Sequence, residues 1–490
     1  MIESHGVKQR NTVKLTRVSV CHDQRLNYPQ IPPFNPSTQH PEYPWPWLAV
    51  EARNDVYDGV RMCLEQLCLD SAHFNTKEWN PLGEIIKPGD TVLVKPNFVL
   101  HQEGTSEQHT AIVTNAGIVR AMIDYVAIAQ QKQGKIIIGD APVLRCQIED
   151  VLRDNGLDAV MAFVRANSDI DIRFVDLREE SIQMGNYGEI IKRQRRNVPS
   201  VSLDIGSSSK LEDIINDAHL FAVESYPRKL TVSSHKPGKH IYDINKVVYD
   251  VDAIINIPKL KTHKKAGITG AVKSFVGLNA NKWRLPHYRI GCPANGGDEY
   301  PATNALREIY RKGLDILAHY DSNIVRLPII AVLYIIRRIL WLTKFPLIVG
   351  GSWHGNDTLW RTICDINKAV YFGDAAGSIH NQLQRNVFHL VDGVIAGEGQ
   401  GPMNPSTKHA GLLLAGFNPF LIDAVACEMM GFDHTKVKSV NNAGECFGVG
   451  VDEATVVLNG DALSFSGVRQ RVNMQFKPAR FWDSIVKREW

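Results

Sequence analysis

The residues TVLVKPN at positions 91–97 and IIIGDAP at positions 136–142 decide the fold class. Each stretch begins with a short apolar, β-branched run, which is typical of a buried strand, and ends in polar or turn-forming residues. Between them, apolar residues recur at helical spacing from Ile118 to Val126, with Thr114 or Asn115 available as the N-cap. This order of strand, helix and strand predicts a βαβ unit with parallel strands.

The predicted unit brings polar side chains to one edge of a sheet. Lys95 and Asn97 follow the first strand, and Asp140 follows the second. Because ligands bind at the carboxyl edge of open α/β sheets, we expect these side chains to lie together at a site. Later strands at 253–257 and 387–391 also lead into polar loops. The pattern predicts an α/β fold with a mostly parallel, Rossmann-like open sheet and helices on both faces.

The remainder of the chain is expected to surround this sheet. At 490 residues, the chain is longer than most single domains. We divide it into an N-terminal arm and helix at 1–84, an α/β domain at 85–435, and a C-terminal extension at 436–490. An apolar helical insertion is expected at 303–355. The arm is predicted to be extended over the surface because residues 24–48 hold seven prolines.

The composition excludes several classes of protein. Hydrophobic residues make up 44% of the chain and charged residues 22%, which is too apolar for general disorder. Lysine and arginine number 55 against 52 acidic residues, so the charge balance does not indicate a nucleic-acid partner. The N-terminus lacks the apolar run of a secretory signal, so we expect a cytoplasmic protein. The eight cysteines include no Cys-x-x-Cys pair, which argues against a zinc ribbon, an iron–sulfur cluster and a disulfide framework.

The apolar segment LPIIAVLYIIRRILWLTKFPLIVG, residues 327–350, allows several interpretations. Its longest uncharged run has ten residues, whereas spanning a bilayer takes about 20. Arg337 and Arg338 beside Trp341 would suit a peripheral contact with the inner membrane. A homodimer contact or a buried helix pair, with the arginines pointing outward, would produce the same pattern.

The segment PKLKTHKKAGITGAVKSFVGLN, residues 258–279, combines lysines with glycines. Ammonium groups and freely accessible backbone N–H groups together bind phosphate or carboxylate, so this segment predicts a site for a small anionic metabolite. Lys259, Lys261 and His263 directly follow a strand, and we expect the Lys259 side chain to project into the loop region rather than the core. The two lysines after His263 are interpreted as part of a solvated basic loop. The spacing is not that of a P-loop.

Oxygen ligands for magnesium or manganese are spread over the second half of the chain. Such a cation would bridge to an anionic substrate. Each carboxylate alone is typical of an N-cap or a surface salt bridge, so the hypothesis depends on their convergence. The candidate ligands are Asp357, Asp365, Asp392 and Glu398.

Six motifs occur in an order that resembles the bacterial domain-of-unknown-function 362 family. The resemblance runs from about Asp90 to Asp433, and a version with GGDEYP and GNDTLWRT resembles a subgroup found in capsule and exopolysaccharide gene clusters. The family implies no defined activity. Some relatives append a ferredoxin-like cysteine domain, but no cysteine follows Cys446 here, and Ser274 stands where relatives commonly show asparagine. The motifs are VLVKPNFV, IIIGDAP, INIPKLKTHKKAGITGAVKSFVGLN, GNDTLWRT, LVDGVIAGEGQGP and NPFLIDAVACEMMGFD.

Our leading hypothesis is an enzyme, a transferase, hydrolase or isomerase, that acts on a phosphorylated or carboxylated, sugar-derived metabolite in polysaccharide biosynthesis. His263 or Asp140 would serve as acid or base, with Lys95 beside them in the catalytic site. One alternative is an epimerase or racemase that abstracts a proton next to a carboxylate without a metal. Another is a non-catalytic scaffold or regulator, recruited through residues 327–350 to a membrane-bound polysaccharide assembly. The predicted substrate-binding residues are Asn97, Lys259, Lys261, Thr262, Lys273 and Arg361.

Overall fold

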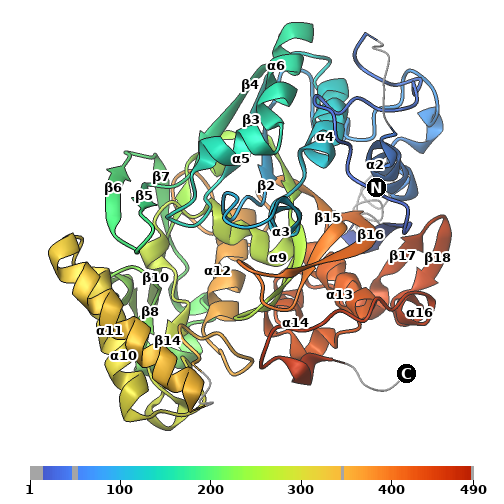
Figure 1. Ribbon diagram of the computed structural model, residues 1–490. Coiled ribbons are helices and arrows are strands. Elements are labelled where there is room, and N and C mark those ends of the chain that lie inside the picture. The colour runs from blue at the N-terminus through green and yellow to red at the C-terminus, as the bar shows by residue number, and fades with distance from the viewer. Residues whose placement is uncertain (1–14, 47–52, 344–346, 487–490) are drawn as a thin grey trace.

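A mixed sheet of eleven strands forms the centre of the protein, whose computed structural model describes residues 15–46, 53–343 and 347–486 (Figure 1). Its main path runs in the order β18-β17-β1-β16-β15-β11-β2-β3-β4, and β12 pairs with β13 and β15. The strands are β1 (Arg17–His22), β2 (Thr91–Pro96), β3 (Lys135–Asp140), β4 (Asp171–Asp176), β11 (Ala253–Ile257), β12 (Lys259–His263), β13 (Gly267–Thr269), β15 (Asn386–Glu398), β16 (Ser406–Gly416), β17 (Thr455–Leu458) and β18 (Asp461–Ser464).

The five neighbouring strands β15, β11, β2, β3 and β4 are parallel, which confirms the prediction of a mostly parallel sheet. From β2 the chain runs outward through β3 and β4, and it later returns to β11 on the other side of β2. Open α/β sheets bind ligands at such a reversal, beyond the carboxyl ends of the strands. The sheet is nevertheless mixed, because β16 is antiparallel to both β15 and β1, and these pairs depart from the expected Rossmann-like order.

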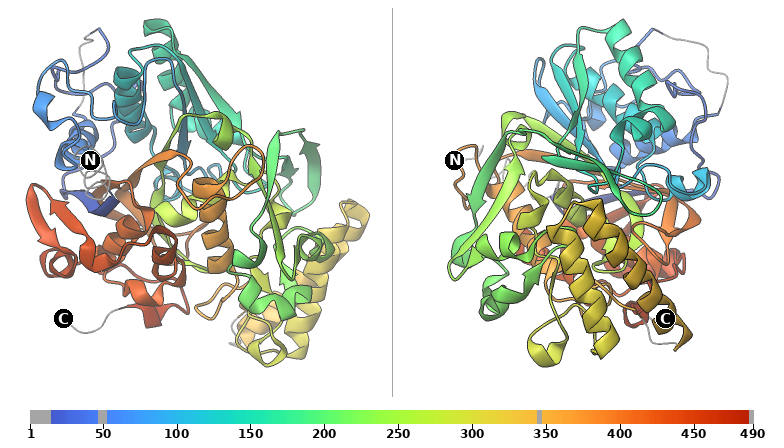
Figure 2. Two further views of the ribbon diagram at one scale, coloured as in Figure 1. Left: turned by 180° about the vertical axis from the view of Figure 1, so that it is seen from behind. Right: turned by 60° about the vertical axis from the view of Figure 1, so that its left-hand side comes forward.

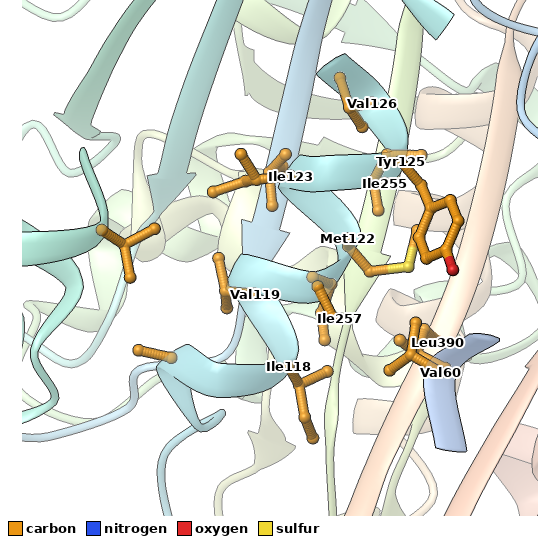
Figure 3. Close-up of a cluster of buried hydrophobic side chains, with 14 of the residues drawn as sticks. Val60, Ile118, Val119, Met122, Ile123, Tyr125, Val126, Ile255, Ile257 and Leu390 are labelled. Atoms are coloured by element: carbon orange, nitrogen blue, oxygen red, sulfur yellow. The ribbon is translucent and has the colours of Figure 1, made fainter. Parts of the chain in front are cut away.

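Helices cover both faces of the sheet (Figure 2). α2 (Asp55–Gln66), α4 (Ala116–Ala129) and α6 (Leu157–Asn167) pack on one face, and α12 (Leu359–Phe372) and α13 (Pro419–Met430) pack on the other. Side chains along β3 point alternately to the two faces of the sheet. Ile136 and Ile138 belong to the hydrophobic cluster on one face, and Ile137 belongs to a cluster on the other. Asn115 caps α4 by accepting the backbone N–H of Gly117. Figure 3 shows the apolar stripe of α4, including Met122, against β11.

The regions 1–84 and 436–490, predicted to be an arm and an extension, contribute β1, β17 and β18 to this same sheet. β1 lies between β16 and β17, so the sheet joins the beginning and the end of the described chain. The proline-rich segment is irregular but not a surface arm, because Tyr28, Phe34 and Trp45 are buried. The Trp45 indole donates a hydrogen bond of 2.7 Å to Asp124 on α4. Apolar side chains between the prolines therefore hold this segment in the core.

The predicted insertion contains two helices that lie side by side at the periphery (Figures 1 and 2). α10 (Ala305–His319) and α11 (Asn323–Leu342) pack closely where Gly313 faces Leu333. α11 buries Leu333, Ile336 and Leu340 toward the protein. Its opposite face is exposed and apolar. Within the described residues, no helix is both long and apolar enough to cross a membrane.

The remaining strands lie outside the central sheet. They form three small sheets with the strand orders β7-β10-β9, β14-β8 and β5-β6. The strands are β5 (Glu180–Met184), β6 (Ile190–Arg195), β7 (Ser200–Asp204), β8 (Phe221–Ala222), β9 (His235–Lys236), β10 (Lys239–Asn245) and β14 (Tyr288–Arg289). The remaining α-helices are α3 (Ser106–Thr110), α5 (Ile148–Asp154), α7 (Arg228–Ser233), α8 (Val247–Asp250), α9 (Ala271–Ser274), α14 (Lys438–Asn441), α15 (Gly444–Phe447) and α16 (Phe465–Arg471).

Candidate functional site

A cavity of about 350 Å³ lies at the carboxyl edge of β2 and β3. Asn97 follows β2, Asp140 ends β3, and the hairpin of β12 and β13 continues the wall into α9. The segments after β8 and before β14 enclose the other side. The acidic residues, lysines and histidines of the lining are Asp140, Glu224, Lys261, His263, Lys264, Lys265, Lys273, Lys282 and His287.

The floor of the cavity holds a buried ion pair. Lys95 Nζ lies 2.9 Å from Asp140 Oδ1 and donates a second hydrogen bond of 3.1 Å to Ser274 Oγ. The other Asp140 oxygen accepts the backbone N–H of Phe98 at 2.8 Å. Lys95 and Asp140 therefore lie together as expected, but both carboxylate oxygens of Asp140 already accept hydrogen bonds from the protein. This arrangement suits a fixed charge better than a mobile acid or base.

Ser274 extends this ion pair into a chain of buried hydrogen bonds. Its hydroxyl donates to Asn256 Oδ1 at 2.8 Å, and the Asn256 amide nitrogen lies 2.9 Å from His389 Nδ1. The other ring nitrogen of His389 lies 2.6 Å from the Tyr371 hydroxyl. Burial lowers the pKa of His389 to about 3, so its ring is neutral. This series of hydrogen bonds holds the Lys95–Asp140 ion pair in place.

The hairpin of β12 and β13 carries most of the basic residues. Lys261 donates a hydrogen bond of 2.6 Å to the carbonyl oxygen of Ile112, and burial lowers the pKa of its amine. His263 Nδ1 accepts the backbone N–H groups of Lys265 and Ala266, each at 3.1 Å. Burial, followed by the charges of nearby lysines, holds the pKa of His263 well below its usual range. His263 is therefore a neutral ring whose Nε2 carries the proton, and it would donate to a ligand rather than remove a proton.

Lys264 and Lys265 line the cavity, so their interpretation as a solvated loop was wrong. The hairpin turns back toward the cavity, and the Trp482 indole anchors it with a hydrogen bond of 2.8 Å to the Lys264 carbonyl. The Lys265 side chain is only 6% exposed and lies 2.5 Å from Glu224, which is 48% exposed. Although burial opposes the shift, Lys265 lowers the pKa of the Glu224 carboxyl.

Lys273 projects from α9, which is held by a carboxylate from the next layer. Asp423 accepts the backbone N–H groups of Ala271 and Val272 at 2.6 and 2.9 Å. Glycine is required at position 270, since a Cβ there would lie 2.1 Å from the Asp423 carboxylate. Burial, followed by the charges of neighbouring lysines, lowers the pKa of Lys273 to about 7.

Lys282 lies in the same cavity and donates a hydrogen bond of 2.5 Å to the carbonyl oxygen of Ala141. Burial lowers its pKa to about 8, even though Asp140 favours the charged form. Sequence reasoning missed Lys282 and Glu224, because neither of them directly follows a strand of the central sheet. They reach the cavity from irregular segments that close over it.

Lys259 does not project into the loop region as expected. It is fully buried, its Nζ lies 3.1 Å from Asp392, and Tyr28 donates to Asp392 at 2.5 Å. Asp392 also accepts the backbone N–H of Asn115 at 3.0 Å. Lys259 is absent from the described residues that line the cavity. The register of β12 against β15 shifts between Lys259, which lies opposite Asp392, and Lys261, which lies opposite Gly397, so the two lysines lie beside different parts of β15.

A family model for the domain of unknown function DUF362 matches residues 92–205 and 200–428. The chain belongs to the DUF362 family. No curated protein matches the chain. A crystal structure of a protein from Thermotoga maritima aligns with 10% sequence identity and a TM-score of 0.30, covering 75% of this chain. The chain spans 58% of that protein's length.

The DUF362 motif residues divide between the cavity and the surrounding structure. Thr262 donates to the Gly399 carbonyl at 2.9 Å, and Arg361 pairs with Asp213 at 2.6 Å and with Asp357 at 3.2 Å. Neither Thr262 nor Arg361 is among the described residues that line the cavity. The predicted residues that do line it are Asn97, Asp140, Lys261, His263 and Lys273.

The four carboxylates predicted to bind a metal do not meet. Asp357 binds Lys438 at 2.8 Å, and Asp365 accepts the Tyr242 hydroxyl at 2.9 Å. Asp392 is paired with Lys259, and Glu398 accepts the backbone N–H of Lys477 at 3.0 Å. Over the described ranges, no group of three or more His, Cys, Asp or Glu side chains is placed to hold a metal ion. The convergence on which the magnesium or manganese hypothesis depended is therefore missing.

Proposed function

We propose that the protein binds a small phosphorylated or carboxylated metabolite in this cavity and acts on it as an enzyme. The observation that carries the proposal is the excess of lysines over free carboxylates in the lining. Asp140 is already paired with Lys95, and Glu224 with Lys265. Among the described residues, four further lysines of the lining lack a carboxylate partner, and these are Lys261, Lys264, Lys273 and Lys282.

Burial makes this excess of lysines costly unless an anion enters. A buried ammonium group loses hydration, which is why the pKa values of Lys273 and Lys282 are lowered. A phosphate or carboxylate would supply the missing charge and accept their hydrogen bonds. The volume of about 350 Å³ lies at the small end of ligand pockets, which favours a metabolite over a polymer.

The narrower proposal of a sugar-derived metabolite is supported by neutral polar groups beside the lysines. Asn97, Ser225, Tyr226 and Thr269 line the same cavity and would bind hydroxyl groups. A sugar derivative as the ligand would agree with a role in polysaccharide biosynthesis, which is the narrower form of the proposal. The epimerase or racemase alternative also uses this cavity, since an uncharged lysine amine can remove a proton next to a carboxylate.

Binding of sulfate, a dianion that resembles phosphate, tests the proposal. Replacing one charge-assisted contact costs about 1.5 to 3 kcal/mol, so Lys282→Ala should weaken sulfate about ten- to 150-fold in calorimetric titration. The matched control is Lys239→Ala, since Lys239 is exposed at the start of β10, and this change should leave the affinity unaltered. Equal sulfate affinity in Lys282→Ala and the unsubstituted protein would place anion binding elsewhere.

We also propose a peripheral contact between α11 and an anionic membrane surface. The outward face of α11 exposes Ile324, Trp341 and Leu342, which are 88%, 67% and 68% exposed. The helix exposes Arg337 and Arg338 and contains no acidic residue, so its surface charge complements anionic headgroups. Arg338 stacks on Trp341 with 5.2 Å between the guanidinium carbon and the ring centroid. The pair combines an interfacial aromatic with a phosphate-binding group.

A further inference from the structure

Lys273 differs from most of the lysines around it because its amine is not held by the protein. Lys261 donates to the Ile112 carbonyl, Lys265 pairs with Glu224, and Lys282 donates to the Ala141 carbonyl. For the Lys273 amine, no hydrogen bond or ion pair is found among the described residues, although it faces the same cavity. Its helix is nevertheless fixed by Asp423. The structure therefore positions the base of the side chain and leaves the amine available.

The charged groups around Lys273 favour its neutral form. Lys282, Lys265 and Lys95 act on it from three different segments, and Asp140 is the carboxylate that opposes them. Asp140 is itself bound to Lys95 at 2.9 Å, so its effect is largely offset. Burial, and after it these charges, lowers the pKa of Lys273 to about 7. About half of the amine groups therefore carry a free lone pair at neutral pH.

We propose that Lys273 is a nucleophile that forms an imine with the carbonyl group of an anionic metabolite. The proposal rests on the function proposed above and narrows the substrate to a phosphorylated or carboxylated aldehyde or ketone. The Lys273 nitrogen attacks the carbonyl carbon, and an N–C bond forms as the C–O double bond becomes single. A proton passes from nitrogen to oxygen to give a carbinolamine. The hydroxyl group then takes up a second proton and leaves as water, and the nitrogen gives up its remaining proton as the C–N double bond forms, so the step needs no oxidant or reductant.

A nucleophilic role explains the lowered pKa of Lys273, and its amine's lack of a partner among the described residues, better than a role as one more contact to the anion. An amine that is half neutral gives less charge to a phosphate than a fully charged one, and other lysines of the cavity already supply charge. Desolvation beside other cations is a physical route by which a lysine becomes nucleophilic. The neighbouring lysines would hold the anionic group while Lys273 reaches the carbonyl carbon.

Borohydride trapping tests the inference. The protein is incubated with dihydroxyacetone phosphate, or with pyruvate as a carboxylate probe, and reduced with sodium borohydride. Peptide mass spectrometry should find one saturable adduct on Lys273. Dihydroxyacetone has the same carbonyl group but no phosphate, and it should label Lys273 at least about tenfold less. Trapping should increase with pH around a midpoint near 7, whereas an ordinary lysine would show its midpoint near about 10.

Substitutions then separate the nucleophile from its surroundings. Lys273→Ala and Lys273→Met should abolish the adduct, and thermal melting shows whether each variant remains folded. Lys239→Ala should trap as well as the unsubstituted protein. Adducts spread over surface lysines, adducts that persist in folded Lys273→Met, or no adduct with either anionic probe would overturn the inference.

Sulfate binding measured on the same samples distinguishes the two proposals. Sulfate binding without trapping rejects the nucleophile alone, and loss of both rejects anion binding as well.

Discussion

At the scale of single residues, two lysines of β12 show how backbone geometry assigns different roles. Lys259 and Lys261 are two positions apart, so a regular strand would direct both to one face. β15 advances five residues, from Asp392 to Gly397, where β12 advances two, so the two lysines lie beside different parts of β15. Lys259 is enclosed with Asp392 and Tyr28, whereas Lys261 reaches the wall of the cavity. Their different neighbours thus distinguish a structural lysine from one at the site.

Removing Lys259 should therefore lower stability rather than anion affinity. Lys259→Met leaves Asp392 buried without its cation, which typically costs about 3 to 5 kcal/mol in the free energy of unfolding. Denaturant titration measures this loss, and the double variant Lys259→Met with Asp392→Leu should recover much of it. Sulfate affinity should stay the same in any variant that folds. If Lys259→Met instead kept its stability and lost sulfate binding, Lys259 would belong to the site after all.

Sulfate affinity should decrease as pH rises through about 7 to 8. The pKa values of Lys273 and Lys282 are lowered to about 7 and about 8, so both amines are charged below this window and neutral above it. Sulfate remains a dianion throughout, so any change reports on the protein. Calorimetric titrations between about pH 6 and 9 measure the effect. Unchanged affinity across that range would mean that neither amine contacts the anion.

At the scale of elements, α11 is a helix with two apolar sides. Leu333, Ile336 and Leu340 pack inward, while apolar residues also cover the side that faces solvent. Asn323 fastens the start of the helix to β6 by exchanging hydrogen bonds with the Ile190 backbone at 3.0 and 3.1 Å. The exposed face is therefore presented in a fixed position.

Charged substitutions on this face should reduce binding to lipid vesicles. Trp341→Glu and Ile335→Glu each remove apolar contact worth about 1.5 to 3 kcal/mol when fully buried, so binding should weaken about tenfold or more. Co-sedimentation with vesicles rich in phosphatidylserine measures this. Leu383→Glu, at an exposed apolar residue outside α11, is the matched control. A dimer seen by sedimentation velocity without lipid, and lost in Trp341→Glu, would assign the face to a second copy instead.

Elements with strong local periodicity could be predicted from the sequence, and contacts between distant segments could not. The β2, α4 and β3 unit follows from its apolar pattern, and so does the placement of Lys95 and Asp140 at one edge. Glu224 and Lys282 reach the cavity only through loop closure, which has no period to detect. Tyr28 meets Asp392 because the N-terminal segment folds against the sheet. Burial likewise depends on tertiary packing, so the positions of Lys259 and Lys265 were misjudged.

At the scale of the whole molecule, the C-terminal segment supports both the sheet and the site. β17 pairs with β1, and Phe476 and Trp482 join the hydrophobic cluster beneath α13. The Trp482 indole also holds the carbonyl of Lys264 in the hairpin that lines the cavity. The packing of this segment and the shape of the site are therefore physically coupled.

Trp482→Ala should affect folding and binding together. Loss of a buried tryptophan side chain costs about 3 to 5 kcal/mol of unfolding free energy, and loss of its hydrogen bond frees the hairpin. Thermal melting and sulfate titration measure the two effects. Trp482→Phe keeps most of the apolar packing without the indole N–H, so it should restore stability more fully than affinity. If both measurements recovered equally, packing alone would position the hairpin.

The position of β1 in the sheet also sets an order of assembly during protein synthesis. β1 and Tyr28 emerge early from the ribosome, but β16, β17 and Asp392 are translated hundreds of residues later. β1 cannot pair with its native neighbours until β16 and β17 have been made, and contacts of such long sequence separation form slowly. Until then it presents unpaired strand edges to other chains, which favours aggregation. The sheet therefore closes around β1 only once β16 and β17 have been made, and this delay prolongs the exposure of its unpaired edges.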